Sequence, residues 1–101
     1  MLKQTDPRDA NMTSLSGYVD ATYAQLVELF GEPLPGDEYK VDAEWVLKDE
    51  YTDQVVTVYN YKNGVNYNGA AGTPVEDITE WHVGGFRTVQ DVDLVRAALG
   101  L

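Results

Sequence analysis

The fold of this chain is decided by one stretch, Asp77-Ile78-Thr79-Glu80-Trp81-His82-Val83-Gly84-Gly85. It holds the one histidine of the chain and one of its two tryptophans. Trp81 and Val83 fall on one side of an extended backbone, and Ile78, Glu80 and His82 fall on the other. This alternation predicts a strand over residues 78–83, which Gly84-Gly85 is predicted to end.

Two further runs precede that strand and predict a hairpin. Every second residue from 41 to 47 is apolar, with Trp45 on the core side, which is typical of a half-buried strand. Residues 55–61 are rich in β-branched and aromatic side chains, which favour strands. Because only the polar stretch 49–53 separates the runs, we expect them to pair antiparallel.

A helix is predicted on each side of the three strands. Thr22 and Gln25 have the spacing of a capping box, and apolar residues recur at helical spacing up to Phe30, which predicts a helix over 21–30 that ends at Gly31. Near the end of the chain, Thr88 is the predicted N-cap of a second helix, and Gly100 is predicted to close it.

These elements predict an α+β fold in the order α-β-β-β-α. We expect a three-stranded antiparallel sheet with the N-terminal and C-terminal helices packed on one face. Residues 1–16 show no periodicity and are interpreted as a mobile arm, and residues 17–101 are interpreted as a single domain. The second face of such a sheet stays partly exposed and is a candidate partner surface.

Charge and composition limit the function classes. The chain has 101 residues and a net charge of −10, from 17 acidic and 7 basic residues, and it has no cysteine. An acidic surface repels nucleic acids and anionic membranes and attracts basic protein surfaces. No apolar run is long enough to span a bilayer and no signal peptide is recognisable, so a cytoplasmic protein is expected.

Catalytic and metal-binding patterns are weak. His82 with Glu80 and Asp77 is the densest combination of imidazole and carboxylate, and it lacks further metal ligands at recognisable spacing. The glycine-rich stretch 63–75 does not match a phosphate-binding loop. The sequence therefore predicts no metal, no cofactor and no enzyme, and a small enzyme using Glu80 and His82 is the least favoured alternative.

The acidic residues suit recognition better than catalysis. In a strand, carboxylates two residues apart are about 6.5–7 Å apart, close to the spacing of phosphates along a nucleic-acid strand. The candidate phosphate mimics are Glu44, Asp49, Glu50 and Asp53. A solvated acidic edge that prevents aggregation explains the same residues, and charge alone does not choose between the two.

Three strings carry a resemblance to known proteins: Asp42-Ala43-Glu44-Trp45-Val46, Val56-Thr57-Val58-Tyr59-Asn60-Tyr61-Lys62-Asn63-Gly64, and Val75 to Gly85 with its Trp-His-Val-Gly-Gly end. Over about residues 17–99 the chain resembles a family of small acidic proteins encoded by bacteriophages. The resemblance implies an accessory phage protein in the host-cell cytoplasm. Such proteins often bind and disable a host enzyme, for example a restriction or CRISPR nuclease.

We therefore expect a protein-binding inhibitor of a host defence or nucleic-acid-handling complex, of the anti-CRISPR or anti-restriction kind. Its partner would be a host protein with a basic nucleic-acid-binding surface, not nucleic acid itself. The candidate anchors for the partner are aromatic: Tyr59, Tyr61, Tyr67 and Trp81. A phage structural or adaptor protein that binds through its sheet face is the alternative, and a homodimer is also left open.

Overall fold

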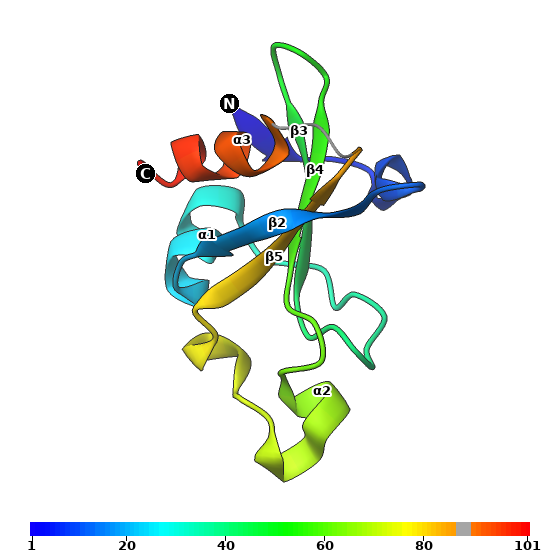
Figure 1. The fold of residues 1–101 in the computed structure, drawn as a ribbon, viewed down its shortest axis with the longest axis vertical. Coiled ribbons are helices and arrows are strands. Elements are labelled where there is room, and N and C mark those ends of the chain that lie inside the picture. Colours follow the sequence, from blue (N-terminus) through cyan, green and yellow to red (C-terminus); the bar gives the residue numbers. More distant parts are fainter. Residues whose placement is uncertain (87–89) are drawn as a thin grey trace.

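The computed structural model describes residues 1–86 and 90–101. Within these residues the chain forms five strands and three α-helices (Figure 1). The strands are β1 (Leu2–Gln4), β2 (Ser14–Asp20), β3 (Glu44–Asp49), β4 (Val55–Tyr59) and β5 (Glu80–Gly85), and the helices are α1 (Tyr23–Phe30), α2 (Val65–Asn68) and α3 (Gln90–Ala98). Three 3₁₀ turns join them: η1 (Pro7–Ala10), η2 (Gly69–Ala71) and η3 (Val75–Asp77).

The strands form one antiparallel sheet in the order β1-β3-β4-β5-β2. The α+β class is confirmed, but the prediction of a three-stranded sheet is wrong. Both additional strands lie wholly or partly in residues 1–16, which were interpreted as an arm outside the sheet. β1 adds to the β3 side and β2 adds to the β5 side, so the N-terminal segment supplies both edges.

The two strands that were not predicted, β1 and β2, lack the sequence pattern that identifies a strand. β1 is three residues long, and only Leu2 is buried. In β2 the register shifts between Leu15 and Gly17, and such a bulge interrupts the alternation of side chains. Val19 is the one residue of β2 that is fully buried. Long-range pairing, rather than local pattern, therefore places these segments in the sheet.

β5 also differs from its predicted bounds, because it runs through Gly84-Gly85 instead of ending there. Both glycines make room for neighbours. A Cβ atom on Gly84 would come 2.5 Å from Thr57 Oγ1, and one on Gly85 would come 2.4 Å from Asp91 Oδ2. The Gly-Gly pair thus allows close packing inside the sheet and does not mark a turn.

The core lies between the sheet and the helices α1 and α3, which cover the same face (Figure 1). The rings of Trp45 and Trp81 pack edge to face with centroids 5.5 Å apart. Each indole is also fixed by a hydrogen bond, since Trp45 Nε1 donates to the Gly31 carbonyl at 2.8 Å and Trp81 Nε1 donates to the Ala21 carbonyl at 3.0 Å. Both tryptophans are therefore structural.

The predicted boundaries of the first helix are confirmed to within two residues. Thr22 is the N-cap of α1, and its side chain and that of Gln25 form the expected capping box. Gly31 follows with φ of 86°, a left-handed conformation that suits glycine. Thr88, the predicted N-cap of the last helix, lies outside the described residues. No helix in the described part of the chain combines the length and apolar character needed to cross a membrane.

The second face of the sheet is covered over β3 and the adjoining part of β4. There η1 lies against both strands, and the Thr5 N–H donates to the Val46 carbonyl at 3.0 Å. Lys48 Nζ and Asp9 Oδ2 form an ion pair at 3.3 Å. Val46 and Thr57 are consequently buried on this face. Among the described residues, no helix covers the remaining part, over β5 and β2.

Candidate binding surface

A row of four side chains crosses the open part of the second face. Glu44 of β3 lies opposite Tyr59 of β4, and Tyr59 lies opposite His82 of β5. His82 in turn lies opposite Tyr18 of β2. Because strands in a sheet are about 4.8 Å apart, the row is about 14 Å long. One carboxylate and three rings thus stand side by side on one face.

The two tyrosines of this row, and a third tyrosine beyond it, pack around the His82 imidazole. The centroid of the His82 ring lies 4.9 Å from that of Tyr18 in an edge-on arrangement and 5.3 Å from that of Tyr59 in a stacked arrangement. Tyr61, just beyond the end of β4, adds a third ring at 5.8 Å. These separations fall within the range of favourable aromatic pairs.

The ring contacts continue away from the sheet through a lysine. Lys62 Nζ lies 5.3 Å from the centroid of the Tyr61 ring and 5.6 Å from that of Tyr67, and Tyr67 contacts Tyr39 at 5.2 Å. We call this set the aromatic strip: Tyr18, Tyr39, Tyr59, Tyr61, Tyr67 and His82. Its outer tyrosines are well exposed, at 52% for Tyr18, 56% for Tyr39, 40% for Tyr61 and 38% for Tyr67.

The far end of the strip is held in place by a buried asparagine. Asn60 Oδ1 accepts hydrogen bonds from the N–H groups of Asp42 and Ala43, at 2.7 and 3.1 Å. Asn60 Nδ2 donates to Asp42 Oδ1 and to Asn63 Oδ1, at 2.9 and 3.1 Å. Asp42 Oδ2 also accepts from the N–H of Asn66 in α2, at 3.2 Å. This network fixes α2, which carries Tyr67, against the loop that carries Tyr39.

Carboxylates flank the strip, and several have no cation beside them. Glu44 makes no side-chain hydrogen bond or ion pair within the described residues, and burial, assisted by the charge of Asp37, raises its pKa above the ordinary value. Asp20 and Glu80 lie directly opposite each other on β2 and β5, where like charges are unfavourable. The strip is therefore bordered by carboxylates that form no ion pair with another described residue.

Burial favours the neutral form of His82. Partial burial lowers its pKa below the ordinary value of 6.5, and the charge of Glu80 opposes this shift only in part. Its Nδ1 atom is buried and has no hydrogen-bond partner among the described residues. No hydrogen bond joins Glu80 and His82 within that part of the chain. The imidazole therefore serves as the central ring of an aromatic cluster, and the pairing expected for catalysis is not formed.

The predicted acidic residues do not form one continuous row. Asp49 is used inside the hairpin turn, where it accepts from the Tyr51 N–H at 3.1 Å and from the Thr52 hydroxyl at 3.2 Å. Glu50 forms an ion pair with Lys3 at 2.7 Å. Asp53 is exposed in the turn, whereas Glu44 lies at the opposite end of β3, about 17 Å away along the strand.

The predicted aromatic anchors divide into two groups. Tyr59, Tyr61 and Tyr67 all belong to the aromatic strip. Trp81 does not, because it is 0% exposed in the core, and its prediction as a surface anchor is corrected. Tyr18 and Tyr39 were missed, since their neighbours in the strip are distant in sequence. The aromatic character of these two residues was the one available signal.

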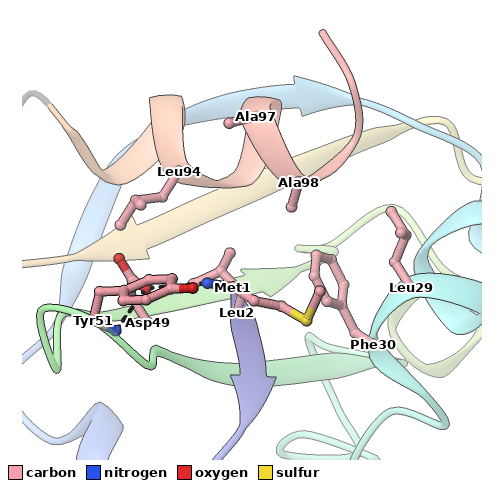
Figure 2. A pocket seen from close by; sticks show the side chains of 9 residues that line it. All are labelled: Met1, Leu2, Leu29, Phe30, Asp49, Tyr51, Leu94, Ala97 and Ala98. Carbon is pink, nitrogen blue, oxygen red and sulfur yellow. Dashed lines mark hydrogen bonds and ion pairs between the residues drawn. The ribbon is translucent and has the colours of Figure 1, made fainter.

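A groove of about 440 Å³ lies elsewhere, between α1 and α3 above β1 (Figure 2). Its walls are mostly apolar and include Leu29, Phe30 and Leu94. Its charged groups pair with each other, because the Met1 amine lies 3.4 Å from Asp49 Oδ1. Glu80 and His82 do not line it. Apart from the Tyr51 side chain, no polar side chain of the described residues lining the groove is left unpaired to orient a substrate.

The chemistry available on the open face is recognition by stacking and by charge. In the described part of the chain, no group of three or more His, Asp or Glu side chains is arranged to hold a metal ion. Exposed tyrosine rings offer flat apolar area and a hydroxyl each, and unpaired carboxylates accept hydrogen bonds from cationic groups. The surface is suited to a partner that presents planar or positively charged groups.

Comparison with known proteins found no matching family model, no matching curated protein and no matching solved structure. The resemblance to small acidic phage proteins therefore stays a prediction.

Proposed function

We propose that this protein binds a partner protein through the aromatic strip and its flanking carboxylates, and that the partner carries a basic nucleic-acid-binding surface. Binding there would keep nucleic acid from the partner. The protein would thus act as an inhibitor of a host defence or nucleic-acid-handling complex, such as a restriction or CRISPR nuclease, and not as an enzyme. The resemblance to phage proteins suggests this class of partner.

The observation that carries the proposal is the run of contacts from Tyr18 to Tyr39 on an open face, made by rings and, between Tyr61 and Tyr67, by the Lys62 ammonium. Tyrosines are enriched among the residues that dominate binding energy at interfaces, because they bury much area at a low cost in side-chain entropy. A structural role does not need four tyrosines left 38–56% exposed. Their exposure supports a surface that a partner covers.

Charge supports the choice of a basic partner. The chain carries a net charge of −10, and the carboxylates of Asp20, Glu44 and Glu80 lie beside the strip without a cation in the described residues. A negative surface accelerates association with a positive one, and this attraction weakens as salt screens it. Nucleic acid and this protein would then compete for the same surface of the partner.

The test is site-specific photo-crosslinking in a bacterial host lysate. A photoreactive amino acid replaces Tyr61 in one variant and Tyr51 in a control variant. Tyr51 is a suitable control because it is 87% exposed but lies in the hairpin turn, outside the strip. We expect position 61, and not position 51, to crosslink one discrete nucleic-acid-binding protein.

Salt and competing nucleic acid then decide the type of partner. We expect 0.5 M salt, or DNA or RNA added before irradiation, to prevent the crosslink from forming, since both weaken the charge-dependent association (about 0.5 M shortens the screening length to roughly 4 Å). A salt-resistant crosslink to a protein without a basic groove would instead favour the adaptor alternative. Equal crosslinking from positions 51 and 61 would contradict a role for the strip.

A further inference from the structure

Glu44 is the carboxylate beside the aromatic strip that most restricts which chemical group of a partner can bind there. Its side chain is half-buried and lies at the β3 end of the row formed with Tyr59 and His82. In the described part of the chain it has neither a hydrogen bond nor an ion pair. A half-buried charge without a partner destabilises the folded chain, and a cation bound beside it would remove part of that cost.

The neighbours of Glu44 restrict which cation fits. Tyr59 lies directly opposite on the next strand and stacks on His82 with an angle of 30° between the ring planes. Asp37 lies close enough for its charge to act on Glu44. A cation in this position would therefore meet negative charge on one side and aromatic rings on the other.

A guanidinium group matches these neighbours better than an ammonium group. It is planar, stacks on aromatic rings, donates two parallel hydrogen bonds to one carboxylate, and loses less hydration when it is partly buried. Neutral ligands such as sugars also stack on tyrosine, but they would leave the charge of Glu44 uncompensated.

We infer that Glu44 and Tyr59 form a seat for an arginine side chain of the partner, with the guanidinium paired to the Glu44 carboxylate and lying against the aromatic strip. This inference rests on the proposed function and names the group that the surface recognises. An arginine in a nucleic-acid groove normally contacts phosphate, so its capture here would also explain how nucleic acid is displaced.

The direct test is a titration of isotopically labelled protein with three short peptides, followed by NMR. The peptides are acetyl-Gly-Xaa-Gly-amide with arginine, lysine or citrulline as Xaa. Citrulline has the shape of arginine without its charge. We expect the arginine peptide to shift the amide resonances of Glu44 and Tyr59 at millimolar concentration, the lysine peptide to do so more weakly, and the citrulline peptide to have no effect.

Two glutamine variants distinguish specific binding at Glu44 from general attraction of a cationic peptide to an acidic protein. Glu44→Gln and Glu50→Gln remove the same charge from opposite ends of β3, and Glu50 is already paired with Lys3. We expect Glu44→Gln to weaken binding of the arginine peptide at least about tenfold and Glu50→Gln to weaken it less than about twofold. Equal losses in both variants would overturn the inference.

Thermal unfolding of the free protein gives a second, independent readout. Because Glu44→Gln removes an unpaired half-buried charge, we expect it to raise the unfolding temperature by about 2–4 °C while it weakens binding. A lower unfolding temperature would show that Glu44 has a stabilising structural role. If the crosslink from position 61 forms but the arginine peptide does not bind, this inference fails and the proposed function stands. If the arginine peptide binds but no protein is crosslinked, the arginine seat stands and the proposed function fails.

Discussion

On one face of the sheet, Trp45 and Trp81 pack edge to face in the core, whereas on the other face Tyr18 and Tyr59 pack around His82. The helices α1 and α3 cover the face with the core (Figure 1). Both clusters are aromatic, and each joins residues from different strands of the sheet. They differ in the hydrogen bonds of their ring nitrogens. Each indole N–H has a backbone acceptor, but the buried Nδ1 of His82 has no hydrogen-bond partner among the described residues.

The difference separates rings that stabilise the fold from rings that are available for binding. A fully covered and hydrogen-bonded ring contributes most of its area to stability, whereas a half-exposed ring contributes little and stays accessible. Mutations of rings on the two faces should therefore have unequal effects on stability, and the largest losses are expected in the core.

Trp81→Ala should destabilise the protein by about 3–5 kcal/mol, because it leaves a large cavity in the core and removes the hydrogen bond to the Ala21 carbonyl. Tyr18→Ala, on the opposite face, should cost less than about 1 kcal/mol. Urea unfolding of the two variants measures both free energies. Similar losses would mean that the second face supports the fold as strongly as the first.

Asn60→Ala should cost about 1–3 kcal/mol, since it leaves the buried N–H groups of Asp42 and Ala43 without their acceptor. It should also loosen the contact between Tyr39 and Tyr67 while it preserves the contacts of His82. Chemical denaturation gives the first quantity, and hydrogen exchange of the two loops gives the second. Unchanged exchange around Tyr67 would contradict the role of Asn60 in holding the far end of the strip.

Stability should decrease as the pH falls below about 6.5, because burial lowers the pKa of His82 in the folded protein. The unfolded chain then takes up its proton first, so the histidine favours unfolding between its ordinary pKa and its lowered one. Glu44 acts in the opposite direction, since its raised pKa makes the folded protein bind a proton more readily. Comparing the wild type with His82→Gln from pH 5 to 8 isolates the histidine; identical profiles would contradict its burial.

Tyr61→Ser should change the free energy of unfolding by less than about 0.5 kcal/mol, as is usual for an exposed side chain. The same substitution should nevertheless reduce partner binding, and Tyr51→Ser in the hairpin turn should not. Thermal unfolding measures the first effect, and binding to the protein that crosslinks from position 61 measures the second. A large loss of stability would place Tyr61 with the structural rings.

The parts of the fold that the sequence predicts correctly are local. The capping box of Thr22 and Gln25 and the hairpin of β3 and β4 involve residues near one another in the chain, where spacing alone determines the structure. β1 and β2 could not be predicted in this way. Their stability comes from pairing with β3 and β5 and from contacts such as that of Gln4 Nε2 with the Phe30 carbonyl, at 2.7 Å.

The residues of the candidate surface likewise divide into those that local sequence could predict and those that long-range contacts bring together. Tyr59 and Tyr61 could be assigned to an exposed face because they follow a recognisable strand. Tyr18 reaches His82 only through the pairing of β2 with β5, and Tyr39 reaches Tyr67 only through contacts between two loops. The prediction of Trp81 as an anchor failed because a strand pattern alone does not tell which of its two faces the helices cover.

The pairing of β2 with β5 also determines when the surface comes into existence during protein synthesis. Tyr18 precedes His82 by 64 positions in the sequence (82 − 18), so Tyr18 is synthesised well before the strand with which β2 pairs. Closing so long a loop is slow compared with forming the β3–β4 hairpin. A nascent chain in which β5 has not yet been made therefore cannot present the complete row of rings, and binding through the row requires β2 and β5 to have paired.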